Sequence, residues 1–320
     1  MSAVTVIIVT WNSCKFLSEC LSHLEAQTIL PSRIILVDNA SSDDTLAILE
    51  AFPNLSLLRM GTNLGFAAGN NHALMECDTE FVALLNPDAF PAPDWLERLL
   101  AAAKKYPDFV AFGSRQLCHS SPDILDGIGD CCHISGLVWR ARHGARQQEK
   151  DLTPQEIFSP CAAGALYRRK ALMEVGAFDE NFFCYVEDVD LGFRLRLAGY
   201  NARYVPDAVI HHVGSVSSGG KHSDFAIYYG HRNLVWTFIK NMPGFLFWLL
   251  LPLHLALNII SIIWYSVRGR GKTILKAKKD AFSDFPRLWK QRRNIQANRV
   301  VSSSQLWKAL DKIFRNKFIF

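Results

Sequence analysis

The sequence predicts an α/β fold in which a mostly parallel sheet is flanked by helices and followed by a C-terminal helical extension. In the first half of the chain, apolar runs of strand length alternate with stretches of helical periodicity, which is the pattern of βαβ units. The last quarter contains a long apolar stretch and a strongly basic tail. That composition is typical of helices that meet a membrane surface.

The composition indicates a globular chain with an uneven charge distribution. It has 320 residues, 49% of them hydrophobic, which is enough to bury a full core and to fill about two domains. Residues 268–320 contain 15 Lys and Arg against 3 Asp and Glu, whereas residues 1–267 contain 20 against 27. The acidic body and the basic tail are therefore expected to meet different partners. No secretory signal is visible, and the eight cysteines lack a CxxC pair, so reduced thiols in the cytosol are expected.

Four apolar runs have the length of buried strands. The helix that follows the first of them shows Leu17, Cys20, Leu21 and Leu24 at helical spacing. The expected strands are Val4–Val9, Arg33–Val37, Leu55–Met60 and Phe81–Leu85. Between them, one helix is expected to start at Asn12 or Ser13, a second at Ser42, and a third to lie around Ala67–Met75.

Polar residues suited to a ligand follow the first, second and fourth strands. They are Thr10-Trp11-Asn12, Asp38 and Asn86-Pro87-Asp88. Proline has no N–H for the sheet ladder, so pairing ends at Pro87 and holds Asp88 on a stiff turn at the carboxyl edge, where ligands of α/β sheets bind. A fixed carboxylate there can hold a divalent metal, and the metal a diphosphate. The alternative for Asp88 is an ordinary type I turn.

The first turn lacks the GxGxxG pattern of dinucleotide sites. An Asp after the second strand instead suits a hydrogen bond to a base or ribose. Trp11 has two open interpretations, since it either stacks on that base or belongs to the core. Residues 114–158 are irregular and predict loops and short strands around an acceptor pocket, and we assign no chemistry to them.

A cluster of acids, Glu187-Asp188-Val189-Asp190, marks the second informative region. Close carboxylates repel one another and raise at least one pKa, and a helix N-terminus offsets part of this cost. Asp190 and Arg194 are expected to pair at i,i+4. The alternative is an ordinary charged helix start, but the neighbouring aromatics Phe182, Phe183 and Tyr185 indicate burial.

The stretch Val205–Ser215 is expected to be a strand that ends in His211 and His212. Adjacent residues of a strand face opposite sides, so only one of the two histidines points into a site. The alternative for either is a core histidine.

Together, these segments resemble the family 2 glycosyltransferases with the GT-A fold, a Rossmann-like nucleotide-binding sheet, and most of all the bacterial rhamnosyltransferases. The resemblance covers roughly residues 4–240, and its motifs are specific in combination. It is carried by Val6-Ile7-Ile8-Val9-Thr10-Trp11-Asn12, Val37-Asp38-Asn39-Ala40-Ser41, Asn63-Leu64-Gly65-Phe66-Ala67-Ala68-Gly69-Asn70-Asn71 and Asn86-Pro87-Asp88.

The resemblance implies an inverting, metal-dependent sugar transfer. Asp38 would bind the base, Asp88 the metal-bridged diphosphate, and Asp188 would be the general base. The metal, Mg²⁺ or Mn²⁺, would be held by Asp88 and His211, with His212 as second choice. The first position of the family's Asp-x-Asp motif is Asn86 here. The other residues expected at the nucleotide sugar are Thr10, Trp11, Asn12, Asn63, Gly65 and Asn71.

By the same resemblance, the donor is expected to be dTDP-rhamnose and the acceptor a glycan or lipid-linked glycan of cell-surface polysaccharide synthesis. Two alternatives stay open. A nucleotidyltransferase would need a Gly-rich and basic phosphate signature near the N-terminus, which the sequence lacks. A scaffold without catalysis is kept open by Asn86.

The apolar stretch Phe245–Val267 contains no Asp, Glu, Lys or Arg, and as a helix it would be about 34 Å long, enough to cross a bilayer. A single crossing would separate the catalytic body from the basic tail, although both are expected to be cytosolic. Pro252 interrupts the run, and His254, Asn258, Ser261 and Tyr265 share one helical face. We expect a kinked, half-buried element that lies in or re-enters the inner leaflet.

The tail supports a monotopic or peripheral protein on the cytoplasmic face of the inner (plasma) membrane. Apolar residues from Ile274 to Trp289 fall near one face between basic residues, and Leu306, Leu310, Ile313 and Phe314 repeat the pattern. Basic amphipathic helices favour anionic membrane surfaces. A nucleic-acid arm is the alternative, but no nucleic-acid-binding motif accompanies the tail.

These expectations divide the chain into three parts. Residues 1–115 form the nucleotide-sugar half of the GT-A domain, residues 116–240 the acceptor and catalytic-base half, and residues 241–320 the membrane-associated extension. The central expectation is spatial: the carboxyl groups of Asp38, Asp88 and Asp188 converge on one cleft.

Overall fold

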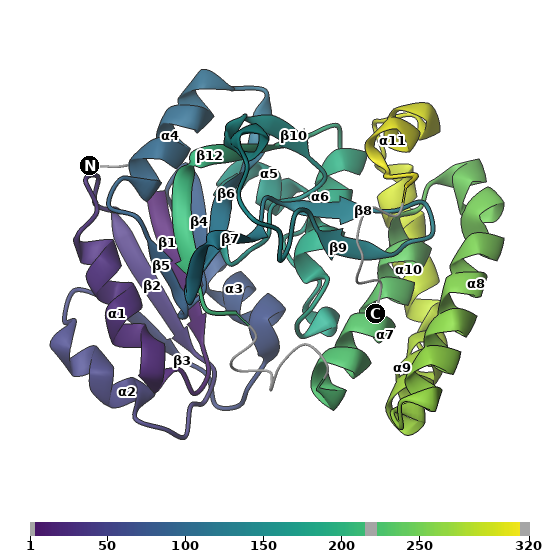
Figure 1. Cartoon of the computed structure of the whole chain (residues 1–320), viewed down its shortest axis with the longest axis horizontal. Coiled ribbons are helices and arrows are strands. Elements are labelled where there is room, and N and C mark those ends of the chain that lie inside the picture. Colours follow the sequence, from purple (N-terminus) through teal and green to yellow (C-terminus); the bar gives the residue numbers. More distant parts are fainter. Residues whose placement is uncertain (1–3, 215–222, 314–320) are drawn as a thin grey trace.

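Figure 1 shows the computed structural model of the chain, in which residues 4–214 and 223–313 are described. A ten-stranded sheet is covered by helices on both faces, and the C-terminal helices gather at one end of the molecule. Ser215 and Phe314, which belong to predicted segments, lie outside the described residues.

The strands are β1 (Val4–Thr10), β2 (Arg33–Asp38), β3 (Ser56–Arg59), β4 (Phe81–Leu85), β5 (Ala89–Pro91), β6 (Phe109–Cys118), β7 (Ser121–Gly127), β8 (Asp130–Cys132), β9 (Val138–Arg140), β10 (Gln155–Ile157), β11 (Gly164–Arg168) and β12 (Asn201–His212). The α-helices are α1 (Cys14–Glu25), α2 (Thr45–Ile48), α3 (Gly65–Met75), α4 (Trp95–Lys105), α5 (Arg169–Glu174), α6 (Glu187–Leu197), α7 (Asp224–Asn241), α8 (Gly244–Val267), α9 (Gly271–Ser283), α10 (Phe285–Ala297) and α11 (Ser303–Ala309).

The first four strands pair in parallel in the order β4-β1-β2-β3, as the alternation of strands and helices predicts. Successive β1 side chains point to opposite faces, and both faces are covered. Val4, Val6 and Ile8 pack with α1 and α4, while Ile7 and Val9 pack with α3. This two-sided burial explains why β1 is a continuous apolar run.

The second half of the sheet is mixed, because β11 pairs antiparallel with both β4 and β6. Along the path β10-β12-β6-β11-β4-β1-β2-β3, four of the seven neighbouring pairs of described strands are parallel. The short β5 pairs antiparallel with the end of β12, which sets His212 opposite Ala89. The Val213 N–H also donates to the Asp88 carbonyl at 3.0 Å. This pairing joins the last histidines of β12 to the turn that carries Asp88.

Helix α8 runs at the outer edge of the molecule (Figure 1) and continues through Pro252. Its polar side chains His254, Asn258 and Ser261 are buried, whereas Trp248 and Ile259 are 62% and 58% exposed. Among the described helices, α8 alone has the length and apolar composition to cross a membrane, and a third of its most apolar window is buried. From His254 onward, α8 thus buries polar side chains and exposes apolar ones, the reverse of a helix on a surface in water.

The C-terminal helices share a core with the rest of the chain. Phe158, Phe182 and Phe193 pack in one cluster with Leu246 and Leu288. The boundary predicted after residue 240 therefore does not separate two cores, and the one predicted after residue 115 falls inside β6. Not every basic residue of the tail is on the surface, since Lys278 and Arg292 are buried and donate to backbone carbonyls.

Candidate active site

A cavity of about 620 Å³ lies where β1, β4 and β12 end and α6 begins. Thr10 and Trp11 line it from the end of β1, Asp88 from the turn after β4, His212 from β12, and Asp188 from the first turn of α6. The sequence thus predicted correctly that acids far apart in the chain meet in one cleft, as far as Asp88 and Asp188 are concerned.

Of the other residues predicted at the nucleotide sugar, Asn63 and Gly65 also line the cavity, whereas Asn12, Asp38 and Asn71 are not among its lining residues. Asp38 is 2% exposed, and its carboxylate accepts the Ser41 N–H at 3.3 Å. The Asn12 side chain accepts the Ser42 N–H at 2.8 Å, and the Asn71 side chain is bonded to the Phe178 backbone. These three side chains hold loops together, so the expected convergence of Asp38 with the other two acids is not observed.

Trp11 is 39% exposed and faces the cavity, which excludes the core interpretation. Gly65 fits its place for a steric reason. Its φ is +83°, and a Cβ added there would lie 2.5 Å from the Phe183 carbonyl oxygen. Glycine therefore lets the start of α3 touch the loop before α6.

His212, and not His211, faces the predicted metal site. Its Nε2 lies 3.3 Å from Oδ1 of Asp88, and its Nδ1 lies 2.8 Å from Oδ2 of Asp126. His211 is not among the residues that line the cavity, because adjacent side chains of a strand point to opposite faces. The structure thus favours His212, the second choice from the sequence, over His211, because the pairing of β12 decides which side chain meets the cavity.

The group around His212 suits a divalent cation. Burial lowers the pKa of His212, but the hydrogen bonds to Asp126 and Asp88 outweigh it and raise the pKa to about 9. Burial also opposes ionisation of Asp88, yet the contacts with His212 and with the Gly214 N–H lower its pKa overall. A pKa of about 9 means that the imidazole carries a proton on both nitrogens at neutral pH, so a cation has to displace the proton on Nε2 before that nitrogen can bind it. With this proton displaced, the Asp88 carboxylate and Nε2 of His212 form a donor set for Mg²⁺ or Mn²⁺.

Asn86, which replaces the first acid of the expected motif, stays close to this group. Its side-chain nitrogen lies 3.4 Å from Nε2 of His212, and its N–H donates to the Ala163 carbonyl. The nitrogen and oxygen of a side-chain amide can be exchanged by a flip. After such a flip, the amide oxygen of Asn86 would lie beside the imidazole and could bind the same cation.

The acidic segment begins α6 as predicted, and the loop before it is strained. Phe183, Tyr185 and Val186 have φ values of +66°, +66° and +69°, which non-glycine residues rarely adopt. Asn233 of α7 holds this loop by donating to the carbonyls of Phe182, Cys184 and Tyr185 at 2.8–3.0 Å. The strain is thus maintained by specific hydrogen bonds that present Glu187 and Asp188 to the cavity.

The three acids of the segment have different surroundings. Asp190 is fully buried and pairs with Arg194 at 2.8 Å, which confirms the predicted i,i+4 pair, and also with Lys240 at 3.0 Å. Asp188 faces the cavity and accepts the N–H groups of Ala162 at 3.3 Å and Val189 at 2.8 Å. Burial raises the pKa of Asp188 despite these bonds and the nearby Arg140. A carboxylate with a raised pKa accepts a proton more readily than an ordinary aspartate, which fits a general base.

The structure adds functional candidates from residues 114–158, to which the sequence analysis assigned no chemistry. Asp126, Asp130, Arg140 and His143, from β7, β8, β9 and the turn after β9, all line the cavity. Asp126 forms ion pairs with Arg140 and His212, and its Oδ1 lies 3.3 Å from Nδ1 of His143. The only signal in the sequence was the grouping of two acids with a nearby Arg and His, which indicates nothing until the loops are placed.

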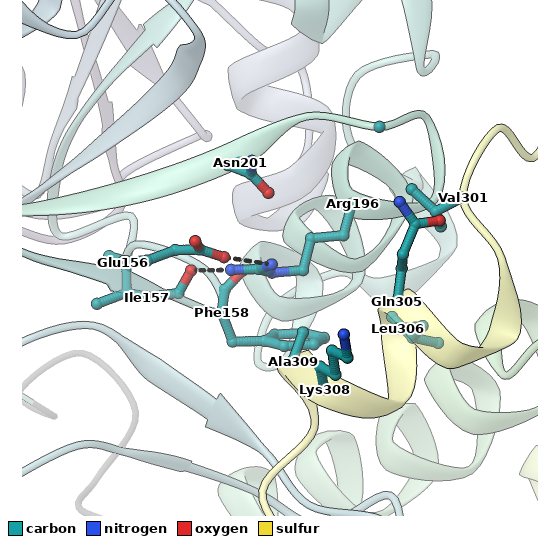
Figure 2. Close-up of a pocket in the computed structure, with 11 residues that line it drawn as sticks. Glu156, Ile157, Phe158, Arg196, Asn201, Val301, Gln305, Leu306, Lys308 and Ala309 are labelled. Atoms are coloured by element: carbon teal, nitrogen blue, oxygen red, sulfur yellow. Dashed lines mark hydrogen bonds and ion pairs between the residues drawn. The ribbon is translucent and has the colours of Figure 1, made fainter.

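A second cavity, of about 560 Å³, lies between β10, α6 and α11 (Figure 2). Two of its three charged lining residues, Arg196 and Glu156, bond each other at 2.9 Å, and the third is Lys308. Arg196 also donates to the carbonyls of Ile157 and Phe158. The guanidinium is therefore satisfied by the protein itself, and this cavity is a less suitable reaction site than the one with the acids.

Two family models match the chain. The model described as glycosyl transferase family 2 matches residues 5–176, and the one described as glycosyl transferase family group 2 matches residues 133–268. The N-acetylglucosaminyl-diphospho-decaprenol L-rhamnosyltransferase of Mycobacterium tuberculosis is 32% identical over 236 residues, which cover 65% of this chain and 75% of the relative. The O-antigen chain rhamnosyltransferase RfbN of Salmonella typhimurium is 24% identical, covering 65% and 66%.

Solved structures share the fold. GalNAc-T7, crystallised with UDP, GalNAc and Mn²⁺, aligns with a TM-score of 0.60 at 15% identity over 74% of this chain, which spans 47% of the GalNAc-T7 chain. The mannosyltransferase PcManGT from Pyrobaculum calidifontis, in complex with GDP-Man and Mn²⁺, aligns with a TM-score of 0.53 at 18% identity over 96% of this chain and 78% of its own. The fold is the expected GT-A-like one, with a mixed sheet. The chain therefore belongs to glycosyl transferase family 2, and it is a glycosyltransferase that is similar to bacterial rhamnosyltransferases.

Proposed function

We propose that the chain is an inverting, metal-dependent glycosyltransferase that moves L-rhamnose from dTDP-rhamnose to a hydroxyl group of a lipid-linked glycan. The observation that carries the proposal is the meeting of Asp88, His212 and Asp188 in one cavity of about 620 Å³. This cavity offers an acidic metal-binding group and a separate carboxylate within reach of one bound substrate pair.

In this proposal Asp188 is the general base. It accepts the proton of the acceptor hydroxyl while the oxygen attacks the anomeric carbon from the face opposite the leaving diphosphate. Its two backbone N–H bonds, from Ala162 and Val189, fix the direction of the carboxylate before the acceptor arrives. Fixed geometry of this kind lowers the entropic part of the barrier.

Asp88 and His212 would hold the cation, Mg²⁺ or Mn²⁺. The bound cation supplies positive charge next to the leaving nucleoside diphosphate. One structural neighbour was crystallised with Mn²⁺ together with UDP, and the other is in complex with Mn²⁺ and GDP-mannose, which supports this choice of chemistry. Trp11 would stack on the nucleotide base, which its exposure at the end of β1 supports.

The rhamnosyl donor and the lipid-linked acceptor are supported by the relatives. Two of them are rhamnosyltransferases, and the name of one gives a decaprenol diphosphate carrying N-acetylglucosamine as acceptor.

A donor panel tests the proposal: dTDP-rhamnose, UDP- and GDP-sugars are offered with a short-chain N-acetylglucosaminyl diphosphoprenol, with and without Mn²⁺ or Mg²⁺. Metal-dependent release of dTDP from dTDP-rhamnose is expected. Metal-independent turnover contradicts the mechanism, and turnover of another donor alone contradicts the choice of sugar.

A position on the cytoplasmic face of the membrane is part of the same proposal. The exposed face of α8 carries apolar side chains, and the exposed Arg268, Arg270 and Lys272 follow directly. Apolar side chains inserted at the level of the acyl chains, with cations at the level of anionic headgroups, are the usual arrangement of interfacial helices. The exposed apolar residues of α8 are Phe245, Trp248, Leu249, Leu253, Leu255, Ile259, Ile260, Ile263, Trp264 and Val267.

Flotation with vesicles tests this position. The double substitution Trp248→Glu, Ile259→Glu is expected to abolish binding to phosphatidylglycerol vesicles, because each apolar side chain contributes about 1.5–3 kcal/mol when it leaves water. Met75→Glu changes an equally exposed apolar residue on α3 and serves as the matched control. Binding that survives the double substitution, or that Met75→Glu abolishes, contradicts a membrane face on α8.

A further inference from the structure

Asp130 is a buried carboxyl group that lines the cavity and has one oxygen atom without a hydrogen-bond partner in the described part of the chain. It lies on β8 and is 7% exposed, and its Oδ2 has no hydrogen-bond partner among the described residues. One oxygen of Asp130, one oxygen of Asp188 and the Sγ of Cys161 lie within 4.8 Å of one another. Burying a polar atom without a hydrogen-bond partner costs free energy of folding, so we expect a polar group of a ligand to form a hydrogen bond with Oδ2 of Asp130.

The surroundings distinguish the two acids. Asp188 accepts two backbone N–H bonds, which favour its ionised form. For Asp130 the nearest cation is Arg140, whose Nε is 3.9 Å from Oδ1, beyond hydrogen-bond distance. The Nη1 of Arg140 is already bonded to Asp126. Two carboxyl groups this close are not readily ionised together, so one proton is retained, and the geometry places it on Asp130.

We propose that Asp130 is a second functional carboxyl group, which carries a proton while Asp188 is ionised and donates a hydrogen bond to an acceptor hydroxyl next to the one that reacts. The inference rests on the proposed function, because it takes Asp188 as the base. Sugars carry hydroxyl groups on adjacent carbons, so an acceptor whose reacting oxygen reaches Asp188 has a second oxygen near Asp130. Asp130 thus recognises the acceptor without adding negative charge beside the base.

The electrostatic surroundings agree with this assignment. Burial raises the pKa of Asp130 well above the usual aspartate range, and the negative charge of Asp188 adds to the effect, which Arg140 only partly offsets. Glu187, also buried in the cavity wall, has a raised pKa for the same reasons. A protonated carboxyl group on Asp130 therefore needs to be distinguished from one on Glu187.

Infrared spectroscopy of the full chain at neutral pH makes this distinction. We expect the carbonyl band of a protonated carboxyl group in the wild type and in Asp123→Asn, an exposed acid of β7 that serves as control. Asp130→Asn is expected to remove one such band, whereas Glu187→Gln leaves that band in place. The proposal is wrong if Asp130→Asn leaves the protonated-carboxyl region unchanged.

Kinetics test the role in acceptor binding. With dTDP-rhamnose, Mn²⁺ and the N-acetylglucosaminyl diphosphoprenol, Asp130→Ala is expected to raise the acceptor KM about tenfold to hundredfold, the cost of leaving one hydrogen-bonding group unpaired. Asp130→Asn keeps a neutral donor at the same place and is expected to restore most of that loss. Mn²⁺ and dTDP affinities should stay as in the wild type for both variants, which excludes a general loss of folding.

Two outcomes would overturn the inference. An equal rise of the acceptor KM in Asp130→Asn and Asp130→Ala would mean that the negative charge of Asp130 is needed. That charge could hold a second cation together with Asp188 and Cys161, and a metal titration would then show two sites. An unchanged acceptor KM in Asp130→Ala would remove Asp130 from recognition. Failure of the proposed function has a different signature, since Asp188→Asn would then retain turnover whatever the result at Asp130.

Discussion

The Nδ1 of His212 lies 2.8 Å from Oδ2 of Asp126, and this contact leaves Nε2 as the nitrogen that faces Asp88. Metal-binding histidines commonly have such a carboxylate on the second nitrogen, which fixes the orientation of the ring and increases its basicity. Asp126 is itself held by Arg140 and His143. We interpret Asp126 as a positioning residue, because it acts through His212.

Asp126→Ala is expected to weaken Mn²⁺ binding about tenfold to hundredfold, the usual effect of losing such an outer contact. The physical reason is that the imidazole loses its fixed direction. Titration of the full chain with Mn²⁺, followed by electron paramagnetic resonance, measures the change directly. Asp123→Asn alters an exposed acid of the same strand and should bind Mn²⁺ as the wild type does. Undiminished affinity in a folded Asp126→Ala variant would contradict the role given to Asp126.

His211 and His212 form a natural pair of matched variants. They are adjacent on β12, but only His212 lines the cavity. His212→Ala is expected to abolish metal-dependent dTDP binding, because it removes the nitrogen that faces Asp88. His211→Ala should leave this binding within about threefold of the wild type, since this half-buried side chain is outside the cavity. Isothermal titration with dTDP in the presence of Mn²⁺ compares the two, and the reverse order of effects would restore the original choice of His211.

The contrast between these two histidines shows how far the sequence predicts the site. Strand periodicity in β1, β2 and β4 is local, so the sheet edge that carries Thr10 and Asp88 was predictable. The face that His211 or His212 presents depends on the pairing of β12 with β5 and β6, which periodicity alone does not fix. Asp126 and His212 are 86 residues apart in the chain. Contacts of this kind depend on loop placement that no local pattern encodes.

Asp38 shows a second limit of local sequence patterns. Its position after β2 was predicted correctly, yet its side chain turns back to the Ser41 N–H instead of entering the cavity. An Asp after a strand readily bonds the backbone two or three residues further on. The strand end therefore predicts where a carboxylate starts but not where its oxygen atoms point.

The pH dependence of turnover is expected to follow Asp188 and its neighbours. Burial raises the pKa of Asp188 above the ordinary aspartate value of 3.8. A general base works only when ionised, so kcat/KM should fall as the pH falls through this raised pKa, with the acid limb above pH 3.8. Asp130 and Glu187 interact with Asp188, so the limb reports the group of acids together. A rate profile from neutral to acidic pH measures it, with Asp123→Asn as control. A limb at or below the ordinary value would contradict a buried base.

Lys240 is expected to contribute to the stability of the fold and not to the reaction. Its ammonium is 2.6 Å from Asp179 and 3.0 Å from Asp190, and all three side chains are buried. The pair joins α7 to α6 and to the turn before the strained loop. Lys240→Met would leave two buried carboxylates short of a positive charge, and breaking a buried pair in this way costs about 3–5 kcal/mol of unfolding free energy.

Chemical denaturation at neutral pH tests this value, and Lys279→Met, an exposed lysine of α9, is the matched control with a change near zero. The pH dependence gives a second check. Burial opposes ionisation of Asp179 and Asp190, but Lys240 lowers their pKa values below the usual range. Groups with lowered pKa values stabilise the fold above the unfolded-state pKa and lose this contribution as the pH falls. The difference between wild type and Lys240→Met should therefore shrink below pH 3.8, and a difference that is constant with pH would show that the cost comes from packing and not from charge.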